Sequence, residues 1–86
     1  MTRVEKILAA LVRVDIFQRM PLSHPGTEYM SEAEAINKVV RDDDSIGRVR
    51  LGVIDALRRT NPGVDLNPVT TLNLADDIHQ TLQEAP

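Results

Sequence analysis

Apolar residues recur at intervals of three and four along much of this 86-residue chain, and this spacing favours helices throughout. Near the start, one face of a predicted helix carries Val4, Ile7, Leu8, Leu11 and Val12. Thr2 and Glu5 have the spacing of a capping box, in which each side chain bonds to the main-chain amide of the other. We therefore predict a helix over about residues 3–18. No segment of useful length alternates as a strand would.

The middle of the chain carries further helix signals. Ser31 and Glu34 have the spacing of a second capping box, which predicts a short helix over about residues 32–40. Asp44 or Ser45 can cap the next helix, which should run to about Thr60 because Asn-Pro-Gly follows it. A single helical turn is expected at residues 67–68.

The last helix is predicted to begin at Asn73, a residue type that caps helices well. Its buried stripe would consist of Leu74, Ala75, Ile78 and Leu82. Prolines at 21 and 25 end the first helix and open a long loop, residues 19–43, in which the short helix lies. The expected fold is all-α, a small bundle of three main helices plus one or two short helices.

Size and composition narrow the possible functions. A chain this short forms one domain, residues 1–86. It has no cysteine, which excludes disulfides, thiolate metal sites and a cysteine nucleophile. The net charge of −3 argues against general nucleic-acid binding. No apolar run approaches the roughly 20 residues of a membrane span, so we expect a cytoplasmic monomer that binds no membrane.

Residues 41–51 concentrate the chemically distinctive side chains. Three aspartates precede Ser45 at the predicted helix start, where the positive end of the helix dipole favours negative charge. In one interpretation, Ser45 is simply a helix cap and the three aspartates are simply a solvent-exposed acidic run. A magnesium or calcium site is a weaker alternative, because the segment lacks EF-hand spacing; we predict no metal site.

The helix that follows has apolar residues on two sides. Leu51 and Ile54 lie away from the main stripe, which is formed by Ile46, Val49, Val53 and Leu57. The second side is either covered by the long loop or exposed as a docking patch. The sequence leaves both interpretations open.

Asp44-Ser45-Ile46, followed by Val49 and Leu51, resembles the attachment motif of acyl carrier proteins. In that family, an Asp-Ser-Leu or Asp-Ser-Ile sequence opens the second main helix. The order of helices is similar over nearly the whole chain, and the threonine-rich segment 70–78 resembles the entry to the family's last helix. The resemblance implies an acyl-carrier-like helical domain.

The resemblance also implies a function for Ser45 as the attachment point of a covalent 4′-phosphopantetheine arm, which would make the chain a phosphoprotein. A separate phosphopantetheinyl transferase would move the arm from coenzyme A with magnesium. Asp44 would help the transferase engage the serine, while Ile46 and Val49 would flank the arm and meet partner enzymes. Arg48 and Arg50 would belong to the same recognition surface.

The implied protein is a carrier and not an enzyme. It would hold acyl or aminoacyl intermediates as thioesters and present them to loading, condensing or other enzymes of a fatty-acid, polyketide or related biosynthetic pathway. Carriers of fatty-acid synthesis tend to have an acidic second helix, whereas this one has arginines at 48, 50, 58 and 59. Its partners should therefore differ. Asp42 also stands where the family usually has glycine.

Two alternatives remain. The domain could be a carrier-like interaction module that is never phosphopantetheinylated. The arginines could instead contact DNA, although the connection over residues 61–68 is too long for a helix-turn-helix. His24 and His79, the only histidines, have no spacing typical of metal binding or of a catalytic triad and are expected at the surface.

Overall fold

The first helix, α1 (Arg3–Val14), begins at the predicted capping box. Thr2 Oγ1 accepts a hydrogen bond from the Glu5 amide at 3.1 Å, and Glu5 Oε1 accepts one from the Thr2 amide at 3.0 Å. The helix ends before residue 18 because Asp15 adopts a left-handed conformation, with φ of 50°. Its amide still donates to the Leu11 carbonyl, which closes the last turn.

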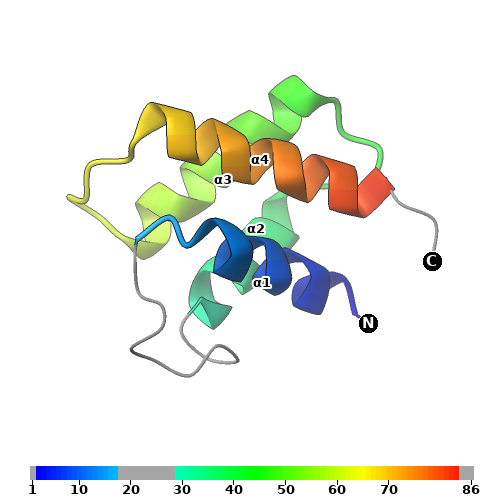
Figure 1. Ribbon diagram of the computed structural model, residues 1–86, viewed down its shortest axis with the longest axis horizontal. Coiled ribbons are helices and arrows are strands. Elements are labelled where there is room, and N and C mark those ends of the chain that lie inside the picture. The colour runs from blue at the N-terminus through cyan, green and yellow to red at the C-terminus, as the bar shows by residue number, and fades with distance from the viewer. Residues whose placement is uncertain (1, 18–28, 84–86) are drawn as a thin grey trace.

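The computed structural model describes residues 2–17 and 29–83, and within them it contains four helices and no strand (Figure 1). This confirms the prediction of an all-α bundle. Residues 18–28, which comprise the predicted end of the first helix and the first part of the predicted loop with His24, lie outside the described ranges.

The short helix, α2 (Met30–Val39), starts slightly earlier than predicted. The expected capping box of Ser31 and Glu34 is wrong, since Ser31 lies within the helix and its N-cap residue is Tyr29, without a side-chain cap. Tyr29 is fully buried, and its hydroxyl donates to Asp15 Oδ1 at 2.5 Å and accepts from the Phe17 amide at 3.1 Å. Tertiary packing of the tyrosine thus accompanies the helix start, in place of local capping.

The two longest helices are α3 (Ile46–Thr60) and α4 (Pro68–Gln83). The predicted start of the last helix at Asn73 is wrong, because Asn73 is an exposed residue inside α4. Asn67 precedes the helix, and its Oδ1 accepts from the Thr70 amide at 3.1 Å. Pro68 suits the first helical position, whose amide needs no partner. The predicted turn at 67–68 and the predicted last helix are therefore one continuous helix.

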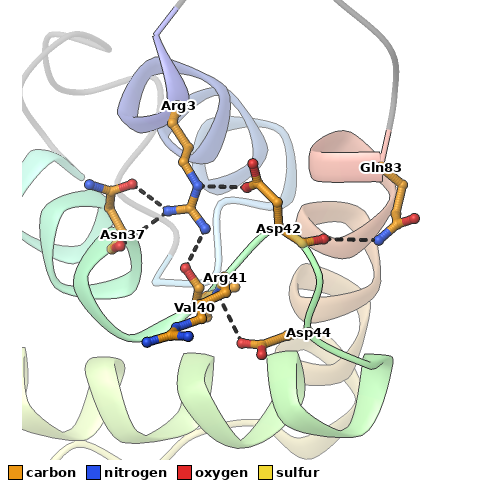
Figure 2. Close-up of polar contacts among 7 residues, drawn as sticks. All are labelled: Arg3, Asn37, Val40, Arg41, Asp42, Asp44 and Gln83. Carbon is orange, nitrogen blue, oxygen red and sulfur yellow. Dashed lines mark hydrogen bonds and ion pairs between the residues drawn. The ribbon is translucent and has the colours of Figure 1, made fainter.

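Each helix packs against two others, in the cyclic order α1, α2, α3, α4. α1 and α4 run antiparallel, so Arg3 and Gln83 lie at the same end of the bundle (Figures 1 and 2). Most of the predicted stripes of α3 and α4 enter the core: Val49, Val53, Leu57, Leu74, Ala75 and Ile78 are buried, and Leu82 packs at the edge. Ile46, the first residue of the predicted α3 stripe, is only half-buried and lies outside the core cluster. None of the four helices is long and apolar enough to cross a membrane.

Candidate functional site

Ser45 is the N-cap residue of α3, and its side chain is exposed. Its Oγ accepts a hydrogen bond from the Arg48 amide at 3.3 Å, which satisfies one of the free amides of the first turn. Because the oxygen acts there as an acceptor, the hydroxyl proton remains available to another group. No hydrogen bond joins Ser45 Oγ to a side-chain base within the described residues.

Asp44 is part of the turn that precedes α3. Its Oδ2 accepts from the Arg41 amide at 2.9 Å, and its own amide donates to the Arg41 carbonyl at 3.2 Å (Figure 2). These two hydrogen bonds connect the last residue of the turn, Asp44, to the main chain of its first residue, Arg41. Ser45, and not Asp44, therefore caps α3, while the Asp44 carboxylate is turned toward the preceding residues.

The turn is also held from the first helix. Arg3 of α1 extends its guanidinium across the end of α2, as Figure 2 shows. Its Nη1 donates to the Asn37 carbonyl at 3.1 Å, and its Nη2 donates to the Val40 carbonyl. Its Nε lies 2.7 Å from Asp42 Oδ1. One side chain thus joins α1 to the last carbonyls of α2 and to the turn.

A fourth contact comes from the end of the last helix. Gln83 Nε2 of α4 donates to the Asp42 carbonyl at 3.1 Å (Figure 2). The segment from Val40 to Ser45 is consequently fixed by α1, by α4 and by its own Asp44. Sequence reasoning missed Arg3 and Gln83, because they lie 39 and 41 positions from Asp42 and no local pattern connects them.

The other predicted recognition residues occupy different environments. Val49 is fully buried in the core, so its side chain does not reach a partner in this conformation, whereas Ile46 is half-buried. Arg50 pairs with Asp76 of α4, with Nη2 and Oδ1 3.1 Å apart. Arg48 is exposed and forms no ion pair with the described residues. Ser45 and Arg48 are therefore exposed, whereas Asp44, Ile46 and Arg50 are half-buried and Val49 is buried.

An open depression of about 710 Å³ lies next to Asp44, between the turn and the outer side of α3. Its lining has both signs of charge and consists of Val39, Arg41, Asp43, Asp44, Arg48, Leu51, Gly52 and Asp55. A charged group with both donors and acceptors would fit this lining better than a purely apolar one.

The acidic residues of the turn do not make a metal-ligand cluster. Over residues 2–17 and 29–83, no three histidine, aspartate or glutamate side chains converge as metal ligands would. The described histidine, His79, is half-buried on α4. What the arrangement offers chemically is an accessible hydroxyl at a helix N-terminus, on a turn that is fixed from three sides.

No family model matches the chain, and comparisons with curated proteins and with solved structures also give no match.

Proposed function

We propose that the chain is an acyl carrier that holds acyl or aminoacyl groups as thioesters on a 4′-phosphopantetheine arm attached to Ser45. The observation that carries this proposal is the exposed Ser45 hydroxyl at the N-cap of α3, directly after Asp44. A helix N-terminus is a favourable place for the negative charge of a phosphodiester. The arm would supply the thiol that this cysteine-free chain lacks.

The lack of a base beside Ser45 among the described residues agrees with a hydroxyl that is modified by another protein. A serine that attacks substrate within its own chain is usually activated by a neighbouring base. Here the activation would come from a phosphopantetheinyl transferase with magnesium bound. Asp44 Oδ2 accepts from the Arg41 amide, so Oδ1 is the carboxylate oxygen that would remain to interact with the transferase and its metal.

The partner enzymes would meet a cationic surface around the arm. Arg48 lies one turn into α3 and is exposed, and Ile46 offers an apolar contact next to the serine. Val49 is buried in the core and would not contact those enzymes directly. Enzymes of the pathway should therefore present carboxylates at this position, in contrast with the basic surfaces that dock acidic carriers.

A second candidate, an unmodified interaction module, is favoured by one observation. Leu51 on the outer side of α3 is 70% exposed and lines the open depression together with Val39, which is 38% exposed, and neighbouring exposed apolar side chains can mark a protein-interaction surface. This function would need no change at Ser45.

Incubation of the purified protein with coenzyme A, magnesium and a broad-specificity phosphopantetheinyl transferase distinguishes the two functions. The carrier function requires a mass increase equal to the arm, located on Ser45 by peptide mapping. Ser45→Asp is the sharpest negative variant, because aspartate caps a helix as well as serine does but has no hydroxyl. Ser31→Ala is the matched control, since Ser31 is also an exposed serine at the start of a helix.

The outcome that refutes the carrier function is a folded protein that stays unmodified while an established carrier domain in the same tube is converted. Modification of Ser45→Asp to the wild-type extent would refute the assignment of the site.

A further inference from the structure

The entrance to α3 is a stretch of chain that the hydrophobic core does not hold. The structure describes all of residues 41–48, and none of them has a buried side chain. The nearest core residues are Val40 before the stretch and Val49 after it. A segment with few buried apolar contacts opens locally at a low free-energy cost. The orientation of Ser45, which lies within this stretch, therefore depends on polar contacts.

Asp42 is the residue through which other helices hold this stretch. Its Oδ1 accepts from Arg3 Nε at 2.7 Å, and its main-chain carbonyl accepts from Gln83 Nε2 at 3.1 Å (Figure 2). Arg3 belongs to α1 and Gln83 is the last residue of α4, so one residue of the turn is joined to two other helices. Arg3 is itself fixed, because its other two guanidinium nitrogens donate to the carbonyls of Asn37 and Val40.

The contacts of Asp42 are transmitted to Ser45 through the turn. The amide and the carboxylate of Asp44 both bond to the main chain of Arg41, and Asp42 is enclosed between these two residues. Ser45 comes directly after the turn, and its Oγ accepts from the Arg48 amide of α3. A displacement of Asp42 would therefore tilt the turn against α3 and change the direction in which the hydroxyl points.

We propose that Arg3 and Gln83 are positioning residues for the transfer of the phosphopantetheinyl group to Ser45. By holding Asp42 from two helices, they keep the hydroxyl in the orientation that the reaction needs. This inference rests on the carrier function proposed above.

The transfer itself is a displacement at phosphorus. Ser45 Oγ forms a bond to the phosphorus next to the pantetheine of coenzyme A, and the bond from that phosphorus to the oxygen that bridges the two phosphates breaks. The adenosine bisphosphate leaves with the electron pair, and the hydroxyl proton passes to a base of the transferase. Arg3 and Gln83 take no part in these bond changes and act only through Asp42.

The positioning acts after the two proteins have bound each other. A reacting group that is displaced by about 1 Å can react about a hundredfold more slowly, even when the substituted residue lies far from it. The side chain of Asp42 is 68% exposed, and an exposed ion pair contributes little to global stability. Loss of the Asp42 contacts should therefore slow the transfer step while the overall stability and the binding of the transferase stay near those of the wild type.

The test measures transfer in a single turnover, with the whole protein, coenzyme A, magnesium and an excess of a broad-specificity phosphopantetheinyl transferase. We expect Asp42→Ala and Gln83→Ala each to lower the limiting rate about tenfold and to leave the half-saturating transferase concentration unchanged. Asp42→Asn keeps an oxygen that can accept from Arg3 Nε, so it should retain most of the rate. Arg3→Lys should lose the rate, because an ammonium cannot reproduce the fork that reaches three acceptors.

Amide hydrogen exchange of the unmodified proteins gives a readout that needs no transferase. The amides of Arg41 and Arg48 bond within the turn and at the start of α3. Both should exchange faster in Asp42→Ala and in Gln83→Ala. The amide of Leu57, in the core part of α3, should keep its wild-type rate. Equally faster exchange of all three amides would mean a general loss of stability and would overturn the inference.

Two exposed residues provide matched controls. Gln80→Ala removes a glutamine from α4 three positions before Gln83, and Asp65→Ala removes a carboxylate from the connection between α3 and α4. Both variants should have the wild-type limiting rate and half-saturating concentration.

The kinetic outcomes separate this inference from the carrier function. The inference alone is overturned if the wild type is modified and Asp42→Ala and Gln83→Ala reach the same limiting rate. It is also overturned if only their half-saturating concentration rises, because these residues would then be contacts of the transferase. A wild type that stays unmodified refutes the carrier function and this inference with it.

Discussion

Gly52 of α3 lies so close to Val40, at the end of α2, that a β-carbon built on it would stand 2.9 Å from Val40 Cγ2. Carbon atoms at that distance overlap, and the branched valine side chain has few alternative rotamers. The close approach of α2 and α3 therefore depends on a glycine.

Gly52→Ala should destabilise the protein by about 1–2 kcal/mol, because overpacking outweighs the gain in helix propensity. Gly47→Ala is the control on the same helix, since a β-carbon there would have no neighbouring atom within 4 Å. That change should be neutral or stabilising by up to about 1 kcal/mol. Urea unfolding of both variants measures the difference. Equal stability of the two would show that the helices can separate at no cost.

Arg3 should contribute more to stability than its exposed ion pair suggests. Arg3→Ala removes the donor from the Asn37 and Val40 carbonyls and should cost about 1–3 kcal/mol. Arg13→Ala, on the same helix, breaks a surface pair with Asp77 and should cost less than about 1 kcal/mol. Chemical denaturation distinguishes them, and a smaller loss for Arg3→Ala would contradict its role in holding the turn.

Asn67 and Asn73 provide a direct test of where α4 begins. Asn67→Ala removes the oxygen that accepts from the Thr70 amide and should cost about 1 kcal/mol. Asn73→Ala replaces an exposed residue inside the helix with the best helix former and should be neutral or slightly stabilising. Thermal unfolding of the pair checks the order. The reverse order would mean that the helix starts at Asn73.

Tyr29→Phe should destabilise the connection between α1 and α2. The phenol is buried and bonds both the Asp15 carboxylate and the Phe17 amide, so its removal leaves these groups without that partner. The expected loss is about 1–3 kcal/mol. Hydrogen exchange should localise the loosening to the end of α1 and the start of α2. Uniformly faster exchange across all helices would instead indicate a global role.

Glu5 should make stability depend on pH in the acid range. Its hydrogen bonds with the amide and hydroxyl of Thr2 hold the pKa of the Glu5 carboxyl below its ordinary value of 4.5. Because the folded pKa is the lower one, this stabilisation is present above pH 4.5 and is lost as the pH falls through the folded pKa. Glu5→Gln should therefore flatten the acid limb of a stability profile measured by urea unfolding. An unchanged limb would contradict the capping role of the carboxylate.

The sequence predicted those parts of the fold that depend on local pattern. The Thr2 box, the buried stripe of α3 and the end of that helix at Thr60 are set by residues within a few positions of one another. The starts of α2 and α4 were mispredicted because several capping-type residues compete nearby. Packing of Tyr29 and the Asn67–Pro68 pair prevailed over Ser31 and Asn73.

The candidate site was only partly accessible to sequence reasoning. The motif correctly located an exposed serine at a helix start, and helical periodicity placed Val49 on the buried stripe of α3. The resemblance nevertheless put Val49 among the recognition residues, and no local pattern indicates that Arg50 pairs with Asp76. Those outcomes depend on which neighbouring helix covers each side of α3. Helical periodicity shows which residues share a side of a helix, but it does not show which other helix packs against that side.

Because Arg3 and Gln83 bind the turn before Ser45 from opposite ends of the sequence, this turn has its full set of contacts only when both α1 and α4 are docked. A short peptide that carries residues 40–50 would contain every local signal and none of this geometry. An enzyme that modified such a peptide as readily as the whole domain would recognise the local sequence alone. An enzyme that modified only the domain would recognise the folded tertiary structure. In the second case, the turn would restrict modification of Ser45 to chains that have folded.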